Sequence, residues 1–224
     1  MTKHLERDLD LLKREILTMG ALVEEATSKA ITALTNRRSD LAEEVRDGDN
    51  VLDATEVHVE ETCLKVLALH QPVATDLRFI VAVLKVNNDL ERMGDLATNI
   101  AERALHLASE DPLPIPLKFE ELGDRVRGMV KDSLDALVNV DPVLARKVCA
   151  DDDAVDALNR DLFRRAQDLM KRKPETVERA VSALSASRHL ERIADQATNI
   201  AEDVIFMVEG EIVRHAPDLL RGEE

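Results

Sequence analysis

Apolar side chains recur at every third or fourth position along most of the chain, which is the pattern of an amphipathic α-helix. Polar and helix-breaking residues interrupt the pattern at a few places, and Pro72 is the clearest break in the first half. Ser39 and Thr75 stand where the pattern resumes, and each is expected to cap the helix that follows it. The pattern therefore predicts three helices in the first half, at residues 4–36, 39–70 and 75–108.

The second half shows the same organisation after a proline-rich segment. DPLPIP, at residues 111–116, is the one cluster of prolines in the sequence and indicates a linker. Asp141 and Pro142 form a typical helix start, in which an N-cap residue is followed by proline at the first helical position. We expect helices at residues 117–139, 142–171 and 174–209, and hence a first unit at 1–110, a second at 117–213 and a tail at 214–224.

Two stretches of nearly identical sequence relate the halves. LERMGDLATNIAE, at residues 90–102, recurs as LERIADQATNIAE at residues 190–202, and ten of the thirteen positions are identical. Upstream, the segment from Ala33 matches the segment from Ala136 at an offset of 103, so three residues have been lost between the two matches. An internal repeat of this length indicates a fold built from two copies of one unit. We predict an all-α fold of two tandem antiparallel three-helix bundles related by internal duplication.

The composition indicates which side chains form the core and which class of partner is disfavoured. Hydrophobic residues make up 45% of the chain but aromatic residues only 2%, so the core is expected to be aliphatic. A net charge of −15 argues against nucleic acid as a partner, because binding a phosphate backbone needs a basic face. Cys63 and Cys149 lack the spacing of a metal or redox site. With no apolar signal segment and no run near the roughly 20 residues that span a bilayer, we expect a cytoplasmic protein.

A second stripe of side chains on the repeated helix is acidic. At about 100° per residue, Glu91, Asp95 and Glu102 lie on one face, turned away from the apolar stripe. The preceding helix carries a matching acidic stripe that includes Asp49 and Asp53. The two stripes therefore either face each other across the hairpin or both face away from it.

The spacing places these acids at the same level along each hairpin. The midpoint in sequence between Asp53 and Glu91 is position 72, the proline of the hairpin. The midpoint between Asp49 and Asp95 is the same position. In the second unit the two equivalent pairs share a midpoint at 173.5, beside Pro174. Neighbouring helices pack about 8–10 Å apart, close enough for carboxylates on both to share bridging metal ions. The candidate ligands are Asp49, Asp53, Glu91, Asp95, Asp152, Asp156, Glu191 and Asp195.

Four neighbouring carboxylates cannot all stay ionised without compensation, so either some are protonated or cations bind. Oxygen donors without histidine suit hard ions such as iron, manganese, magnesium or calcium, bound singly or in clusters, and make zinc less favoured. The alternative is an ordinary solvated face, with Arg92 and Arg192 in surface ion pairs. We favour metal binding because the pattern is duplicated and level in both hairpins.

The sequence contains no motif of an enzyme. Glu-x-x-His, the signature of di-iron carboxylate bundles, is absent. There is also no glycine-rich phosphate loop, no nucleophile elbow and no Cys/His pair with catalytic spacing. We expect a metal-binding regulatory adaptor and no catalysis, and the alternative is a helical scaffold without a functional metal site.

The repeated acidic signature, together with QPVATDLRFIVAVLK from Gln71, resembles the PhoU family, accessory regulators of bacterial phosphate transport. The resemblance covers nearly the whole chain, including its two units. It implies a cytoplasmic, metal-binding homo-oligomer, commonly a dimer. It also implies a negative regulator that links the phosphate ABC transporter to a membrane sensor histidine kinase when phosphate is ample. Association with the membrane is then expected only through these partners.

The metal-binding motifs of the family fall on the eight candidate acids, and Asn99 and Asn199 match a position that follows the motif. The second unit departs from the first where QPVATDLRF is replaced by KRKPETVER. A binding role for Arg78 and its neighbours therefore has no counterpart in the second half.

Overall fold

Six long helices account for most of the chain in the computed structural model, which describes residues 3–115 and 117–210. The predicted tail at 214–224, the end of the second predicted unit and the last residue of the predicted linker lie outside the described residues. The helices are α1 (Lys3–Asn36), α2 (Ser39–His70), α3 (Ala74–Ser109), α4 (Phe119–Asn139), α5 (Pro142–Arg172) and α6 (Val177–Glu209), with a short 3-10 helix, η1 (Pro174–Thr176), before α6.

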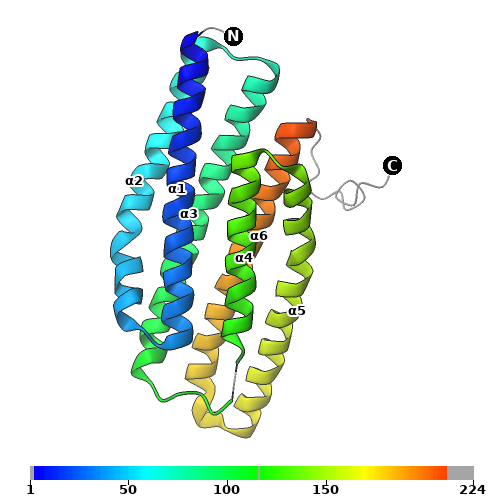
Figure 1. Ribbon diagram of the computed structural model, residues 1–224. Helices are drawn as coiled ribbons and strands as arrows, with labels where there is room; N and C mark the ends of the chain where they lie inside the picture. The colour runs from blue at the N-terminus through cyan, green and yellow to red at the C-terminus, as the bar shows by residue number, and fades with distance from the viewer. Residues whose placement is uncertain (1–2, 116, 211–224) are drawn as a thin grey trace.

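The helices form two up-and-down bundles that lie side by side (Figure 1). One bundle contains α1, α2 and α3, and the other contains α4, α5 and α6. Contacts between the bundles are made by α3 with α6 and by α1 with α4, whereas α2 and α5 lie at the outer edges. This arrangement confirms the predicted all-α fold with two three-helix units in tandem. None of the described helices is both long enough and apolar enough to cross a lipid bilayer.

The core is aliphatic, as the composition predicts, and it is continuous through both bundles. Leucine, isoleucine, valine and methionine side chains fill it, and Cys63 is buried among them. Alanine is frequent among the buried residues of α3 and α6, the two helices that join the bundles. Small side chains let helix backbones approach closely, so the alanines suit these helices to a central position.

The helix starts confirm one predicted cap and contradict two. Asp141 caps α5, since its Oδ1 accepts hydrogen bonds from the backbone nitrogens of Val143 at 2.9 Å and Leu144 at 3.1 Å. Neither α2 nor α3 has a side-chain cap, so the predictions for Ser39 and Thr75 are wrong. The turns before these helices are too short: Ser39 is already the first residue of α2, and Thr75 is the second residue of α3.

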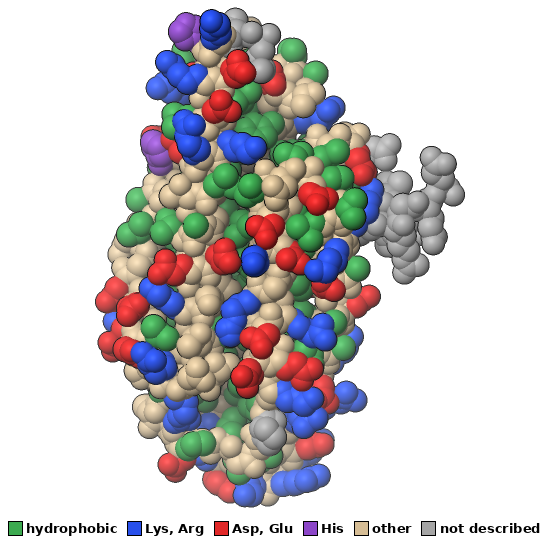
Figure 2. Space-filling model, in the orientation of Figure 1, with side chains coloured by type: hydrophobic (Ala, Val, Ile, Leu, Met, Phe, Trp, Pro, Cys, Tyr) green, Lys and Arg blue, Asp and Glu red, His purple; other side chains and the backbone are tan. Residues whose placement is uncertain are grey.

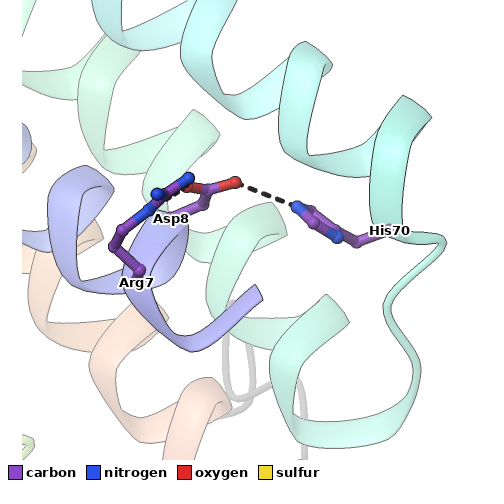
Figure 3. Close-up of polar contacts among 3 residues, drawn as sticks. All are labelled: Arg7, Asp8 and His70. Carbon is purple, nitrogen blue, oxygen red and sulfur yellow. Dashed lines mark hydrogen bonds and ion pairs between the residues drawn. The ribbon is translucent and has the colours of Figure 1, made fainter. Parts of the chain in front are cut away.

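A polar contact ties the start of α1 to the end of α2 (Figure 3). His70, the last residue of α2, lies 2.9 Å through Nε2 from Asp8 Oδ2, and Arg7 lies 3.2 Å from Asp8 Oδ1. The hydrogen bond with His70, followed by the contact with Arg7, holds the pKa of Asp8 below its ordinary value. A second contact, between His58 Nε2 and Glu15 Oε1 at 3.0 Å, joins the same two helices further along. These histidines therefore serve the packing of α1 on α2.

Two glycines allow α1 and α4 to cross closely, and they occupy equivalent positions in the repeat at the offset of 103 residues. A Cβ atom on Gly20 would lie 2.8 Å from Cδ2 of Leu134, and one on Gly123 would collide with Cγ2 of Ile31. Leu134 is itself the repeat counterpart of Ile31. Each helix thus receives the other's aliphatic side chain at its glycine, as in a contact with two-fold symmetry.

We predict that Gly123→Ala lowers the free energy of unfolding by about 1–3 kcal/mol, because Ile31 is branched at Cβ and cannot rotate its methyl group away. The matched control is Gly128→Ala on the same helix, where an added Cβ meets nothing within 4 Å. There the gain in helix propensity should stabilise the protein by up to about 1 kcal/mol. Urea denaturation measures both variants, and equal effects at the two positions would contradict the close crossing.

Candidate metal centres

The eight predicted ligands lie on two hairpins, α2–α3 in the first unit and α5–α6 in the second. Within each hairpin the acids of one helix raise the pKa of acids on the other, as Asp49 and Asp53 do for Asp95. Asp195 on α6 does the same for Asp152 on α5. Of the two arrangements that the sequence left open, the structure therefore has the acidic stripes facing each other.

Burial and mutual repulsion both raise the pKa of these acids. For Glu91 the largest cause is burial, followed by the charges of Asp95, Glu56 and Asp53. Burial followed by the charge of Asp95's counterpart, Asp195, raises the pKa of Asp152 to about 6. Each stripe thus keeps negative charges close together in a setting that disfavours them.

Hydrogen bonds to the acids differ between the two hairpins. In the first, the hydroxyl of Thr98 donates to Asp49 Oδ1 at 3.0 Å, which leaves the negative charge uncompensated. In the second, Arg160 donates through Nη1 to Asp156 Oδ2 at 2.9 Å and supplies a positive charge. Sequence reasoning missed Arg160, although its spacing of four residues from Asp156 on a helix is a signal for such a pair.

The arginines within the repeated motif do not form the ion pairs that the solvated-face alternative expected. Among the described residues, neither Arg92 nor Arg192 has a carboxylate oxygen within 4.0 Å. Their charges lower the pKa of Glu91 and Glu191 only as minor contributions that burial and the neighbouring acids outweigh. The acidic stripes are therefore not neutralised from within their own motif.

The amides that follow the motif in both halves of the chain form hydrogen bonds within their own helices. Asn99 Nδ2 donates to the backbone carbonyl of Asp95 at 2.8 Å, and Asn199 Nδ2 lies 3.5 Å from Gln196 Oε1. In this arrangement neither amide is directed at the acids of the facing helix.

Two buried polar residues that the sequence analysis did not single out hold the facing helices together. Asn87 of α3 donates through Nδ2 to the backbone carbonyl of Glu56 on α2 at 2.9 Å. Its repeat counterpart, Ser187 of α6, donates to Asn159 Oδ1 on α5 at 3.0 Å. Both bonds lie about one helical turn from the acidic pairs, so they help to keep the carboxylates level.

The carboxylate oxygens are of the type that binds hard cations, but the side chains do not converge on one point. Within the described part of the chain, no three His, Cys, Asp or Glu side chains converge closely enough to hold a metal ion. The carboxylates instead line each hairpin in two facing rows. Binding an ion therefore requires rotation of these side chains, which their half-buried to exposed positions permit.

We predict that Asp152→Asn stabilises the metal-free protein at pH 7.5 by about 1 kcal/mol, a value reduced for solvent screening. Burial and the neighbouring acids raise the folded-state pKa of Asp152 to about 6, above the ordinary aspartate value of 3.8, so ionised Asp152 disfavours folding above this range. The folded state takes up the proton as pH falls, and the gain from the substitution should vanish near pH 4.

Urea denaturation in chelator at the two pH values measures this effect. Glu61→Gln, which removes an exposed carboxylate elsewhere on α2, is the control and should change stability by less than about 0.5 kcal/mol. An equal effect of Asp152→Asn at both pH values would show that burial and the facing carboxylates do not raise the pKa of Asp152.

Comparison with known proteins gives the same two-unit division. The profile of the PhoU domain matches residues 16–104 and again residues 119–204. The chain is 42% identical to the phosphate-specific transport system accessory protein PhoU homolog of Aquifex aeolicus, over 97% of this chain and 98% of that protein. It is 35% identical to the phosphate-specific transport system accessory protein PhoU of Escherichia coli, over 93% and 86% of the respective lengths.

Solved structures agree with these sequence matches. The crystal structure of PhoU from Pseudomonas aeruginosa superposes with a TM-score of 0.90 at 37% identity, covering 92% of this chain and 99% of that one. The crystal structure of the phosphate transport system regulatory protein PhoU from Streptococcus pneumoniae gives 0.87 at 30% identity, covering 93% and 99%. The matched relatives are named as accessory or regulatory proteins and not as enzymes, in agreement with the expectation from the sequence. The chain belongs to the PhoU family, because it has two PhoU domains in tandem, is 42% identical to a PhoU homolog over nearly its whole length, and shares the fold of a PhoU crystal structure.

Proposed function

We propose that the protein is a cytoplasmic accessory regulator of phosphate uptake that binds hard metal ions between α2 and α3 and between α5 and α6. The observation that carries the metal part is the pair of facing acidic rows, in which burial and like charges raise the pKa of the carboxyl groups. A bound cation removes this repulsion, so the energy that disfavours the empty rows favours the ion. The regulatory part rests on relatives named for phosphate-specific transport.

The residues proposed to hold the ions come from both helices of each hairpin. Carboxylate oxygens bind iron, manganese, magnesium or calcium, and the absence of histidine from the rows makes zinc less favoured. The proposal allows more than one ion in each hairpin because each of the two acids on one helix is level with an acid on the other helix. In the first unit the ligands are Asp49, Asp53, Glu91 and Asp95, and in the second they are Asp152, Asp156, Glu191 and Asp195.

We expect the purified protein to carry metal in stoichiometric amount and to lose it when the motif acids are neutralised. The variant combines Glu91→Gln, Asp95→Asn, Glu191→Gln and Asp195→Asn, and elemental mass spectrometry measures the metal. A control with the same loss of charge at exposed positions outside the rows should retain it: Glu24→Gln, Glu43→Gln, Asp10→Asn and Asp124→Asn.

Metal should also raise the thermal unfolding midpoint of the wild type, because a ligand that binds only the folded state stabilises it by mass action. The four-site variant should show no such shift. Absence of metal from the wild type, even after loading with iron, manganese, magnesium or calcium, would refute the metal centres.

The proposed partners are the phosphate ABC transporter and a sensor histidine kinase, between which a homodimer of the protein acts as a negative regulator. Under this proposal the protein reaches the membrane through these partners. The metal ions fix the geometry of the outer hairpins, where each partner could distinguish a loaded from an empty surface.

We expect a strain that lacks this protein to express phosphate-starvation genes even in ample phosphate. A reporter enzyme under the control of such a gene measures the effect, and the wild-type protein should restore repression. The four-site variant, present in equal amount and folded by circular dichroism, should restore it by less than half. Full repression by this variant would show that regulation does not require metal binding.

A second function is favoured by one observation, the lack of a preformed group of three ligands among the described residues. In this alternative the protein is a helical scaffold whose acidic rows serve as a docking surface without metal. The elemental analysis distinguishes the two functions, because the scaffold should carry no metal while still restoring repression.

A further inference from the structure

A groove of about 710 Å³ lies between α5 and α6 of the second bundle. This volume is in the range of pockets that hold small organic ligands. Its lining combines two candidate metal ligands with three arginines and an exposed aromatic ring: Asp156, Glu191, Arg160, Arg164, Arg188 and Phe163.

The lining is ordered along the groove by the helical repeat. Arg160 follows Asp156 by four residues and Arg188 precedes Glu191 by three, so both arginines lie about one turn beyond the acids, towards the α5–α6 turn. Phe163 lies almost one turn further along α5. The groove thus runs from an acidic end, through a basic centre, to an aromatic end.

Phe163 is unusual in this protein, which has four phenylalanines and no other aromatic residue. Its side chain is 49% exposed, whereas the other three phenylalanines are half-buried. Leaving an apolar ring in water forgoes stabilisation that burial would give. What distinguishes this ring is its place in a groove beside arginines, where its face is open to a ligand.

The first hairpin lacks this lining at every equivalent position except the acids. At the offsets of the internal repeat, Val57 stands for Arg160 and Asn88 stands for Arg188. Glu60 and Glu61 stand for Phe163 and Arg164. The basic and aromatic parts of the groove are thus a property of the second unit and not of the duplicated scaffold.

These side chains suit one kind of small molecule. Guanidinium groups bind phosphate oxygens with charge-assisted hydrogen bonds. A planar base stacks on an exposed aromatic ring, and the stacking tolerates any base. Carboxylates repel phosphate unless a cation lies between them, and nucleoside di- and triphosphates carry magnesium on their phosphates.

We propose that this groove binds a nucleoside phosphate as its magnesium complex, with the base on Phe163, the phosphates on Arg160 and Arg188, and the cation beside Asp156 and Glu191. Arg160 exchanges its ion pair with Asp156 for the phosphate when the ligand enters. Only the place of the cation rests on the metal centre proposed above, since the arginines and the ring act on the ligand directly.

The test is the binding of ADP to the full chain by isothermal titration calorimetry, with and without magnesium. The variant Arg160→Val with Arg188→Asn copies the first hairpin and should weaken ADP binding at least about tenfold, the equivalent of about 1.4 kcal/mol. Phe163→Ala should weaken ADP binding about 5- to 100-fold and leave the binding of pyrophosphate unchanged. The control, Arg14→Val with Arg125→Asn, removes the same charge from exposed positions on other helices and should bind ADP as the wild type does.

Failure to bind ADP in the presence of magnesium overturns the proposal, as does equal binding by wild type and the arginine variant. If pyrophosphate binds as tightly as ADP and Phe163→Ala weakens neither, the ligand is an inorganic phosphate and the proposal of a nucleotide is overturned. The arginine variant keeps all eight candidate metal ligands, so its metal content should equal that of the wild type. If the arginine variant loses ADP binding but retains its metal, the result supports the nucleotide site independently of the metal centres. If ADP binds equally well without magnesium, the role given to the cation is overturned.

Discussion

The packing between the two bundles is the contact on which the rest of the architecture depends. A three-helix unit of this kind has an open apolar face, and α3 and α6 cover that face for each other along much of their length. Gly20 and Gly123 let α1 and α4 approach closely at the same interface. The face of the molecule in Figure 2 carries acidic and basic side chains interspersed over its surface. The core is continuous across the interface between the bundles, so the outer helices α2 and α5 are held by a rigid centre.

That rigid centre explains how like charges can be kept together on the outer hairpins. The helices are aligned by apolar packing and by the bonds of Asn87 and Ser187, and the acids must follow the backbones that carry them. The helices do not shift to separate Asp152 from Asp195, so burial and the charge of Asp195 together raise the pKa of Asp152. A strain of this kind is more typical of a site than of a plain surface, because binding can release it.

The sequence was sufficient for the helices, for the two units and for the level of the acids, since all three follow from periodicity and the repeat. It was not sufficient for the caps at Ser39 and Thr75, because the length of a turn is set by the packing of the helices it joins. The crossing at Gly20 was also missed. A helical pattern tells which face of a helix is buried but not which helix covers that face. The contact with Leu134 explains why position 20 is a glycine.

The differences between the two hairpins are as informative as their likeness. Both keep four acids level, yet the second places Arg160 against Asp156 where the first has Thr98 against Asp49. A duplicated scaffold can preserve one property in both copies while one copy acquires another, because each hairpin faces solvent separately. Since the arginines lie one turn from the acids, any anion bound there is within electrostatic reach of a cation held by the rows. Under the two proposals above, the second hairpin couples an anion to a cation, whereas the first binds a cation alone.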